Sequence, residues 1–196
     1  MKEDLLKIIN NYGVMPQLKY FQSEVFELIE AILEHWYEEY KYYPEVEKHL
    51  IEHIAEEIAD NFVMLYQFPL YYYEWLDEHN IAPYEFKTDN YENIEDINKY
   101  LKDFQRNSIF KLNRAVITAE EREQDYISEY RYEDVIEAVD EVMYKLISIK
   151  EYYHITDGQI KEVMEYKVKR QLERIKNEDN WFVKQRCKRR RITPKI

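Results

Sequence analysis

Residues that form tight turns are scarce in this sequence. Its 196 residues include two Gly and five Pro. An all-β domain of many short strands needs frequent turns, and Gly and Pro supply most of them. Glu, Lys, Leu and Ile, which favour helices, are instead abundant. The composition therefore predicts an all-α protein, and the chain is long enough to bury a core without disulfides.

Cysteine and long apolar stretches are scarce as well. Cys187 is the only cysteine, which excludes a disulfide framework and a zinc site built on cysteine. No stretch approaches the roughly 18 consecutive apolar residues of a membrane-spanning helix. The first residues, MKEDLLKIINNYG, lack the pattern of a secretory signal. We therefore expect a cytoplasmic protein that makes no membrane contact.

Several catalytic signatures are also missing. The sequence has no Gly-rich phosphate loop and no Ser/His/Asp set. Its five His show no metal-ligand spacing with the cysteine. These absences argue against P-loop and hydride-transfer chemistry.

Acidic residues outnumber basic ones, and the charge is unevenly spread. The net charge is −12, but residues 184–196 (KQRCKRRRITPKI) contain seven Lys or Arg and no acid, so residues 1–183 alone carry −19. Such an acidic body suits cation binding and does not suit a broad nucleic-acid surface. The basic tail could bind nucleic acid or an acidic partner, or fold back on the body.

Apolar residues recur at three- and four-residue spacing, which predicts helices. Gly13 is placed to end a first helix, and Thr156 to Gln159 have the form of a capping box that starts the last one. Residues 80–93 are polar and are interpreted as a connection. The predicted helices span residues 16–40, 94–119, 133–154 and 156–176, with another that begins at Pro44 and is bent or ended by Pro69.

The chain also resembles itself at an interval of just over 80 residues. Three segments match three later ones in the same order, with small insertions or deletions between them. The matches predict a tandem duplication of a helical-hairpin unit, with repeat 1 at about 15–90 and repeat 2 at about 98–176. The paired segments are 18–22 with 101–105 at an offset of 83, 25–32 with 109–116 at 84, and 57–60 with 137–140 at 80. We therefore expect one helical domain over 1–183, followed by the tail.

Four carboxylates in repeat 1 have a spacing that suits a metal ion. Glu24 and Glu27 lie three residues apart on one predicted helix, and Glu57 and Asp60 lie three apart on the next. Residues i and i+3 share a helix face, so two antiparallel helices could bring all four together. A hard cation, Mg²⁺ or Mn²⁺, would then neutralise them.

The alternative is that these acids are ordinary solvated helix surface, as most such pairs are in a chain with 40 acids. The periodicity places Glu57 and Asp60 away from the main apolar stripe of their helix. Apolar neighbours on the acidic face, namely Tyr20, Ala31 and Met64, favour a groove instead.

At these residues the sequence resembles a known family. QLKYFQSEVFELIEAI at 17–32 and EHIAEEIAD at 52–60 resemble the two metal-binding helices of the MazG-like, all-α nucleoside triphosphate pyrophosphohydrolases, in which E-E-x-x-E is followed by E-x-x-D. Residues 153–175 resemble the closing part of phage and bacterial members, where a K-x-x-R-x-x-x-R-I helix follows. The resemblance implies a MazG-like helical bundle whose metal ligands are Glu24, Glu27, Glu57 and Asp60. Ser23 stands where the family often has its leading Glu.

The resemblance implies Mg²⁺-dependent hydrolysis of a nucleoside triphosphate to a monophosphate and pyrophosphate. It also implies a homodimer in the cytoplasm of a bacterium or a phage-infected cell. Either Glu27 or Glu57 would be the catalytic carboxylate that orients the attacking water. Lys167, Arg170 and Arg174 share a helix face and would bind the phosphates; the alternative is surface ion pairing with Glu165, Glu173 or Glu178.

The second copy lacks part of this set. Ser108 aligns with Glu24 and Lys111 with Glu27, and only Glu137 and Asp140 are retained. An ammonium cannot ligate a cation, so we expect no complete metal site there. This asymmetry resembles the dimeric dUTPase branch of the superfamily. Lys111 and Arg114 could then neutralise phosphate, although ordinary surface pairing with Glu is the commoner role of such residues.

Two further roles stay open at this level. Base recognition needs aromatic and amide groups near the carboxylates, and each candidate could equally be a packing residue. The aromatic run YYYEW at 71–75 could cover a nucleotide or pack between helices. The candidates for base recognition are Gln17, Tyr20, Phe21, Trp36 and Asn61.

Two rival functions compete with the enzyme. One is a non-catalytic helical interaction protein on a degenerate scaffold, favoured by Ser23, Ser108 and Lys111. The other is a nucleic-acid-binding accessory protein that acts through residues 184–195.

Overall fold

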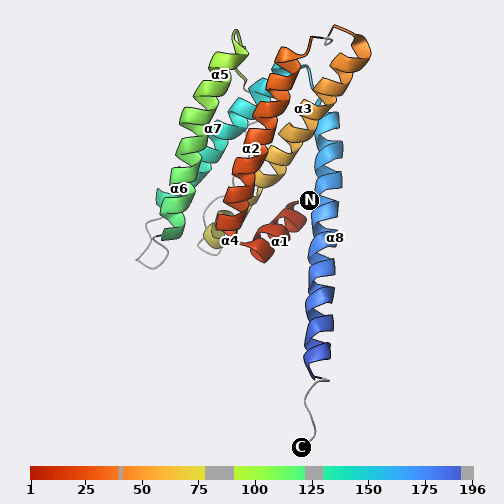
Figure 1. Cartoon of the computed structure of the whole chain (residues 1–196). Coiled ribbons are helices and arrows are strands. Elements are labelled where there is room, and N and C mark those ends of the chain that lie inside the picture. Colours follow the sequence, from red (N-terminus) through yellow and green to blue (C-terminus); the bar gives the residue numbers. More distant parts are fainter. Residues whose placement is uncertain (40–41, 78–90, 122–129, 191–196) are drawn as a thin grey trace, which may run out of the picture.

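The structure is a computed structural model of the whole chain, and it describes residues 1–39, 42–77, 91–121 and 130–190 (Figure 1). Every regular element in these residues is a helix, which confirms the predicted all-α fold. None of the described helices is long and apolar enough to cross a bilayer. The elements are α1 Lys2–Tyr12, α2 Val14–Tyr37, α3 Pro44–Leu65, α4 Gln67–Asp77, α5 Ile97–Asp103, a π-helical segment Phe104–Ile109, α6 Phe110–Glu121, α7 Tyr130–Tyr152 and α8 Asp157–Arg190.

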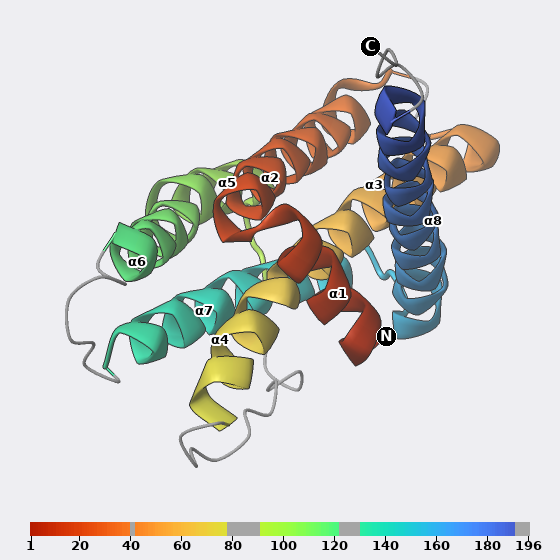
Figure 2. The ribbon, with the colours of Figure 1, turned by 90° about the horizontal axis from the view of Figure 1, so that it is seen from below.

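Four long elements form the centre of the molecule. The hairpin of α2 and α3 lies beside a second hairpin, made of the α5 to α6 rod and α7 (Figure 1). Seen from below, α8 lies beside α3 and far from α6 (Figure 2). The short α1 packs against α2, α4 and α8.

One continuous core joins the two hairpins. The apolar stripes predicted from the periodicity face inward, because burying them removes their surface from water. The residues at the centre of this core are fully buried. They include Phe21 and Leu28 of α2, Ile54 and Ile58 of α3, Phe104 of the π-helical segment, Leu112 of α6, and Val135, Val142 and Leu146 of α7.

The helix boundaries follow local signals. Gly13 adopts the left-handed φ of 88° and its N–H donates to the Ile9 carbonyl at 2.7 Å, which ends α1 as predicted. The Thr156 N–H donates to Gln159 Oε1 at 2.9 Å, and the Gln159 N–H donates to Thr156 Oγ1 at 3.3 Å, so the predicted capping box is present.

Pro69 does not end the helix that begins at Pro44. That helix, α3, already stops at Leu65, and Pro69 lies in the first turn of α4. A proline is tolerated there because the first turn has backbone N–H groups without helical partners. The predicted connection over 80–93 falls largely outside the described residues.

The aromatic run at 71–75 contributes to helix packing through Tyr72. Its hydroxyl donates to Glu120 Oε1 at 2.8 Å, and its ring lies 4.9 Å from that of Tyr132, centroid to centroid. Burial and the Glu120 carboxylate raise the pKa of Tyr72 far above its ordinary value. Tyr72 therefore joins α4 to α6 and α7.

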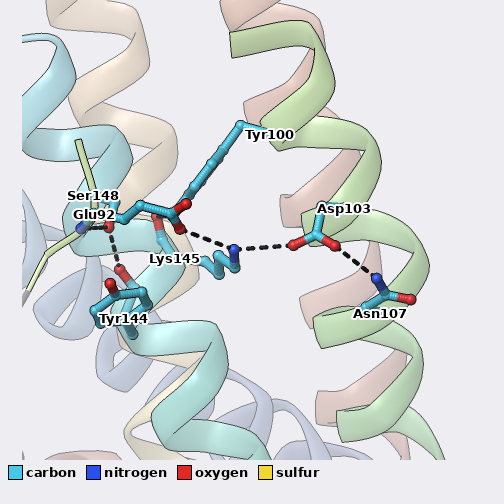
Figure 3. Close-up of polar contacts among 7 residues, drawn as sticks. All are labelled: Glu92, Tyr100, Asp103, Asn107, Tyr144, Lys145 and Ser148. Atoms are coloured by element: carbon cyan, nitrogen blue, oxygen red, sulfur yellow. Dashed lines mark hydrogen bonds and ion pairs between the residues drawn. The ribbon is translucent and has the colours of Figure 1, made fainter. Parts of the chain in front are cut away.

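A partly buried lysine links the elements of the second hairpin (Figure 3). Lys145 Nζ on α7 lies 3.3 Å from Glu92 Oε2 and 3.0 Å from Asp103 Oδ2, and it stands 4.4 Å from the centroid of the Tyr100 ring. Asp103 also accepts a 2.6 Å hydrogen bond from Asn107 Nδ2. The cluster holds α5 and the start of the π-helical segment against α7.

The π-helical segment coincides with the place where the two sequence copies differ by one residue. The offset between matched segments rises from 83 at residues 101–105 to 84 at residues 109–116, and the π-helix spans Phe104–Ile109. A π turn absorbs one extra residue while keeping the faces of the helix on either side aligned. This agrees with the duplication, which stays a prediction.

A one-residue deletion tests this interpretation. Removing Arg106, an exposed residue of the π-helix, should convert the segment to regular α-helix. We expect this deletion to change the free energy of unfolding in urea only slightly. Removing the exposed Arg114 from α6 should rotate the following turn by about 100° and turn its apolar face away from the core. We expect that control to lose about 3 kcal/mol or more in urea unfolding. Equal losses in the two variants would contradict the interpretation.

Candidate metal centre

Three of the four predicted ligands come together between α2 and α3. Glu24, Glu57 and Asp60 each offer a carboxylate oxygen, and these oxygens lie within 4.8 Å of one another. The three-residue spacing places Glu57 and Asp60 on one face of α3, and α2 runs antiparallel beside it. The convergence agrees with the sequence-based prediction for these three residues.

Glu27 lies outside this group of three. Its side chain is exposed, one helical turn beyond Glu24. It is still close enough for its charge to act on Glu24 and Glu57. Glu27 therefore borders the cluster without contributing to its closest set of oxygens.

The cluster carries more negative charge than its surroundings compensate. Burial is the main cause that raises the pKa of Glu24 and of Glu57 to about 7, and the neighbouring Asp60 and Glu27 charges add to it. Burial also raises the pKa of Asp60, although a hydrogen bond from Lys167 opposes this. A bound cation would favour the ionised form of all three.

Two buried oxygen atoms at the cluster have no hydrogen-bond partner, Glu57 Oε2 and Asn61 Oδ1. Glu57 is only 7% exposed. Its other oxygen lies 3.6 Å from His53 Nε2, and His53 Nδ1 is 3.4 Å from Glu34 Oε2. Leaving a buried carboxylate oxygen unpaired is costly, so this atom marks a position where a ligand is expected.

Two of the residues proposed for base recognition have structural roles, and two others are exposed. Asn61 is fully buried, and its Nδ2 donates to the carbonyls of Glu24 at 2.9 Å and Glu57 at 2.8 Å, which is a structural role. Phe21 is a core residue against Phe68. Tyr20 is exposed on the same face of α2 as Glu24, and Trp36 is partly exposed near the end of that helix.

Gln17 is the remaining candidate. It is 3% exposed, and its Oε1 has no hydrogen-bond partner. With Tyr20 and Glu24 it forms an i, i+3, i+7 row on α2. Gln17 is buried about two helical turns before Glu24, whereas Tyr20 is exposed one turn before it.

The predicted phosphate ligands differ in their surroundings. Lys167 on α8 donates a hydrogen bond to Asp60, so it contacts a predicted metal ligand directly. Glu165, one of the surface partners considered for this row, lies 4.0 Å from Lys161 instead. Arg170 is exposed, and its charge also reaches Asp60. Arg174 is exposed, and its charge acts on Tyr12 of α1.

In the predicted repeat 2, a lysine compensates two of the carboxylates. Lys111 Nζ lies 2.7 Å from Glu137 Oε1 and 3.1 Å from Glu141 Oε2. Ser108, aligned with Glu24, is fully buried, and its Oγ has no partner. Within the described residues the acidic group in repeat 1 is the one metal-like cluster. Lys111 therefore forms surface ion pairs with Glu, the commoner of the two roles expected for it.

An apolar cleft of about 460 Å³ lies elsewhere, between α3, α7 and α8. Phe62, Met143 and Met164 are among its wall residues, and Lys150 and Asp157 lie at its polar edge. None of the three clustered carboxylates lines it, so it is separate from the candidate metal centre.

No protein-family model, curated protein or solved structure matches this chain. The residues of the site therefore carry the functional inference. Sequence reasoning found Glu24, Glu57 and Asp60 from their spacing, but it missed the Lys167 to Asp60 contact and the role of Asn61. No local signal encodes either one, because the partners lie on different helices.

Ionisation of the cluster should destabilise the metal-free fold. The pKa of Glu57 is about 7 in the folded chain against an ordinary value of 4.5. Between these values the folded state binds more protons than the unfolded state, so the free energy of unfolding falls as pH rises from about 4.5 to 7 and is level above that.

Glu57→Gln mimics the protonated acid and should remove this loss. In urea unfolding with a chelator, we expect the variant to exceed the unsubstituted chain by about 1–3 kcal/mol at pH 8 and to match it at pH 5. Glu137→Gln is the matched control, because Lys111 lowers the pKa of Glu137. A stability difference for Glu57→Gln that did not change with pH would contradict the prediction.

Proposed function

We propose that this protein is a Mg²⁺- or Mn²⁺-dependent nucleoside triphosphate pyrophosphohydrolase of MazG-like type, which releases a nucleoside monophosphate and pyrophosphate. The observation that carries the proposal is the convergence of Glu24, Glu57 and Asp60 within 4.8 Å. All-oxygen ligation by carboxylates suits Mg²⁺ or Mn²⁺ and does not suit Zn²⁺. The unpaired, buried Glu57 Oε2 supports a cation at this position.

The donor set fits such an ion. Glu24, Glu57 and Asp60 would hold it between α2 and α3. A bound divalent ion of this kind neutralises phosphate charge and makes water a better nucleophile. Glu27, exposed beside the cluster, is the carboxylate we assign to orient the attacking water and accept its proton.

The groups around the cluster support a triphosphate substrate. Arg170 and Arg174 extend the row of cations along α8 from Lys167, and exposed guanidinium groups are well suited to phosphate oxygens. Tyr20 and Gln17 precede Glu24 on α2 by about one and two helical turns. We assign the phosphates to α8 and the base or sugar to this end of α2.

The proposal includes a homodimer acting in the cytoplasm. Phe26 on α2 and Phe110 on α6 support association, because they occupy matched positions of the two copies and are 57% and 64% exposed. The two helices contact each other, with Gln22 Nε2 donating to Asn113 Oδ1 at 3.0 Å. Exposed aromatic side chains on two neighbouring helices are typical of a subunit contact.

Two observations favour the rival function, a non-catalytic interaction protein on a degenerate scaffold. Lys167 already supplies a positive charge to Asp60, and Ser23 stands in place of an acid. A cluster with its own counter-ion has less need of metal.

Pyrophosphate release separates the two functions. With a panel of ribo- and deoxynucleoside triphosphates, we expect turnover that requires Mg²⁺ or Mn²⁺ and falls roughly 100-fold or more in Glu57→Gln and Asp60→Asn. Glu137→Gln and Asp140→Asn change the matched positions of the second copy and should keep activity within about twofold. The absence of turnover with every nucleotide would favour the interaction protein.

The role of Glu27 can be tested by itself. Glu27→Gln should lower kcat by roughly 100-fold or more, the effect typical of removing a general base, while the affinity for Mn²⁺ changes little. An equal loss of Mn²⁺ affinity and of kcat would instead make Glu27 a metal ligand.

A further inference from the structure

Lys167 belongs to the acidic cluster although it comes from a different part of the chain. Its ammonium donates to Asp60 Oδ2, and the side chains of both residues are 15% exposed. Its charge also lowers the pKa of Glu24 and Glu57, in opposition to burial. One ammonium from α8 therefore acts on all three carboxylates.

This single charge does not satisfy the cluster. Three carboxylates, with Glu27 nearby, face one ammonium, and Glu57 Oε2 is buried without a hydrogen bond. A divalent cation would supply more charge and could also contact this oxygen. The ammonium on Asp60 Oδ2 and a metal ion on the same carboxylate would repel each other, so the two compete for Asp60.

The position of Lys167 on α8 also allows its ammonium to move away from Asp60. The residue lies on α8 in a row with Arg170 and Arg174, both exposed. A lysine has a flexible four-carbon stem, so its charged end can leave Asp60 for the solvent side of the helix without a change in the backbone. There it would stand with the two arginines, where the proposed phosphates lie.

We propose that Lys167 and the divalent cation are alternative counter-ions of Asp60, and that metal binding releases the Lys167 ammonium to bind substrate phosphate. This inference rests on the proposed function. Lys167 then opposes the binding of metal alone and assists the binding of metal together with nucleotide. Such opposite effects are not expected of a residue that only packs α8 against α3, or of one that is a permanent phosphate ligand.

Metal binding without nucleotide gives the first test. We expect Lys167→Met, which keeps most of the apolar stem, to bind Mn²⁺ roughly tenfold more tightly than the unsubstituted chain in calorimetry. Lys169→Met is the matched control, because it removes an exposed lysine from the same helix and should leave Mn²⁺ affinity unchanged. An equal gain in both variants would reflect net charge alone and would overturn the inference.

Two further measurements follow the ammonium itself. In the unsubstituted chain, Mg²⁺ should move the NMR signal of the Lys167 ε-methylene toward that of an exposed lysine. With saturating Mg²⁺, Lys167→Met should bind a nucleotide bearing a non-hydrolysable α,β-imido bridge roughly tenfold more weakly. An unmoved signal, or unchanged nucleotide affinity, would overturn the release of the ammonium.

The outcomes distinguish this inference from the proposed function. If the unsubstituted chain binds no Mn²⁺, or if Asp60→Asn binds Mn²⁺ as tightly as the unsubstituted chain does, the metal centre is wrong and the proposed function fails with it. If Asp60→Asn abolishes Mn²⁺ binding but Lys167→Met does not strengthen it, the metal centre stands and the competition is wrong.

Discussion

The contact on which the candidate site depends is the one that Asn61 makes between α2 and α3. Its fully buried amide donates to the carbonyls of Glu24 and Glu57 at once, which fixes the register of the two helices. A slip of one helical turn, about 5.4 Å, would separate carboxylates that now meet within 4.8 Å. Their mutual repulsion opposes this register, and the apolar packing of residues such as Phe21 and Ile58 on the inner faces maintains it.

The carboxylates of the two hairpins differ in burial and in how their charge is compensated. In the second, Lys111 forms ion pairs with Glu137 and Glu141, and it lowers the pKa of the exposed Glu137. In the first, the carboxylates are more buried and the pKa of Glu57 rises to about 7. Charge that is partly buried and incompletely compensated is typical of a functional site, whereas an exposed ion pair is typical of a surface.

Helix α8 makes the first hairpin different from the second. It lies along α3 and away from α6 (Figures 1 and 2). Lys167 therefore contacts Asp60 of the first hairpin, and the charge of Arg170 also reaches Asp60. The two hairpins therefore differ in chemistry because α8 packs mainly against the first of them. The proposed division of labour follows from this placement, with ligation by α2 and α3 and phosphate binding by α8.

The sequence by itself determined the all-α fold, the Gly13 and Thr156 boundaries, and the spacing that lets Glu24, Glu57 and Asp60 meet, because periodicity, capping and i, i+3 spacing are local properties. It did not predict that the last helix continues from 176 to Arg190, or that a π-helical segment interrupts the helix expected over 94–119. Only the tertiary structure decided the Lys167 to Asp60 contact, the Asn61 bridge and the Lys145 cluster. It also decided that Glu27 stays exposed beside the site. These depend on which helix lies against which, and the partners are separated by up to 107 residues, a distance over which local patterns carry no information.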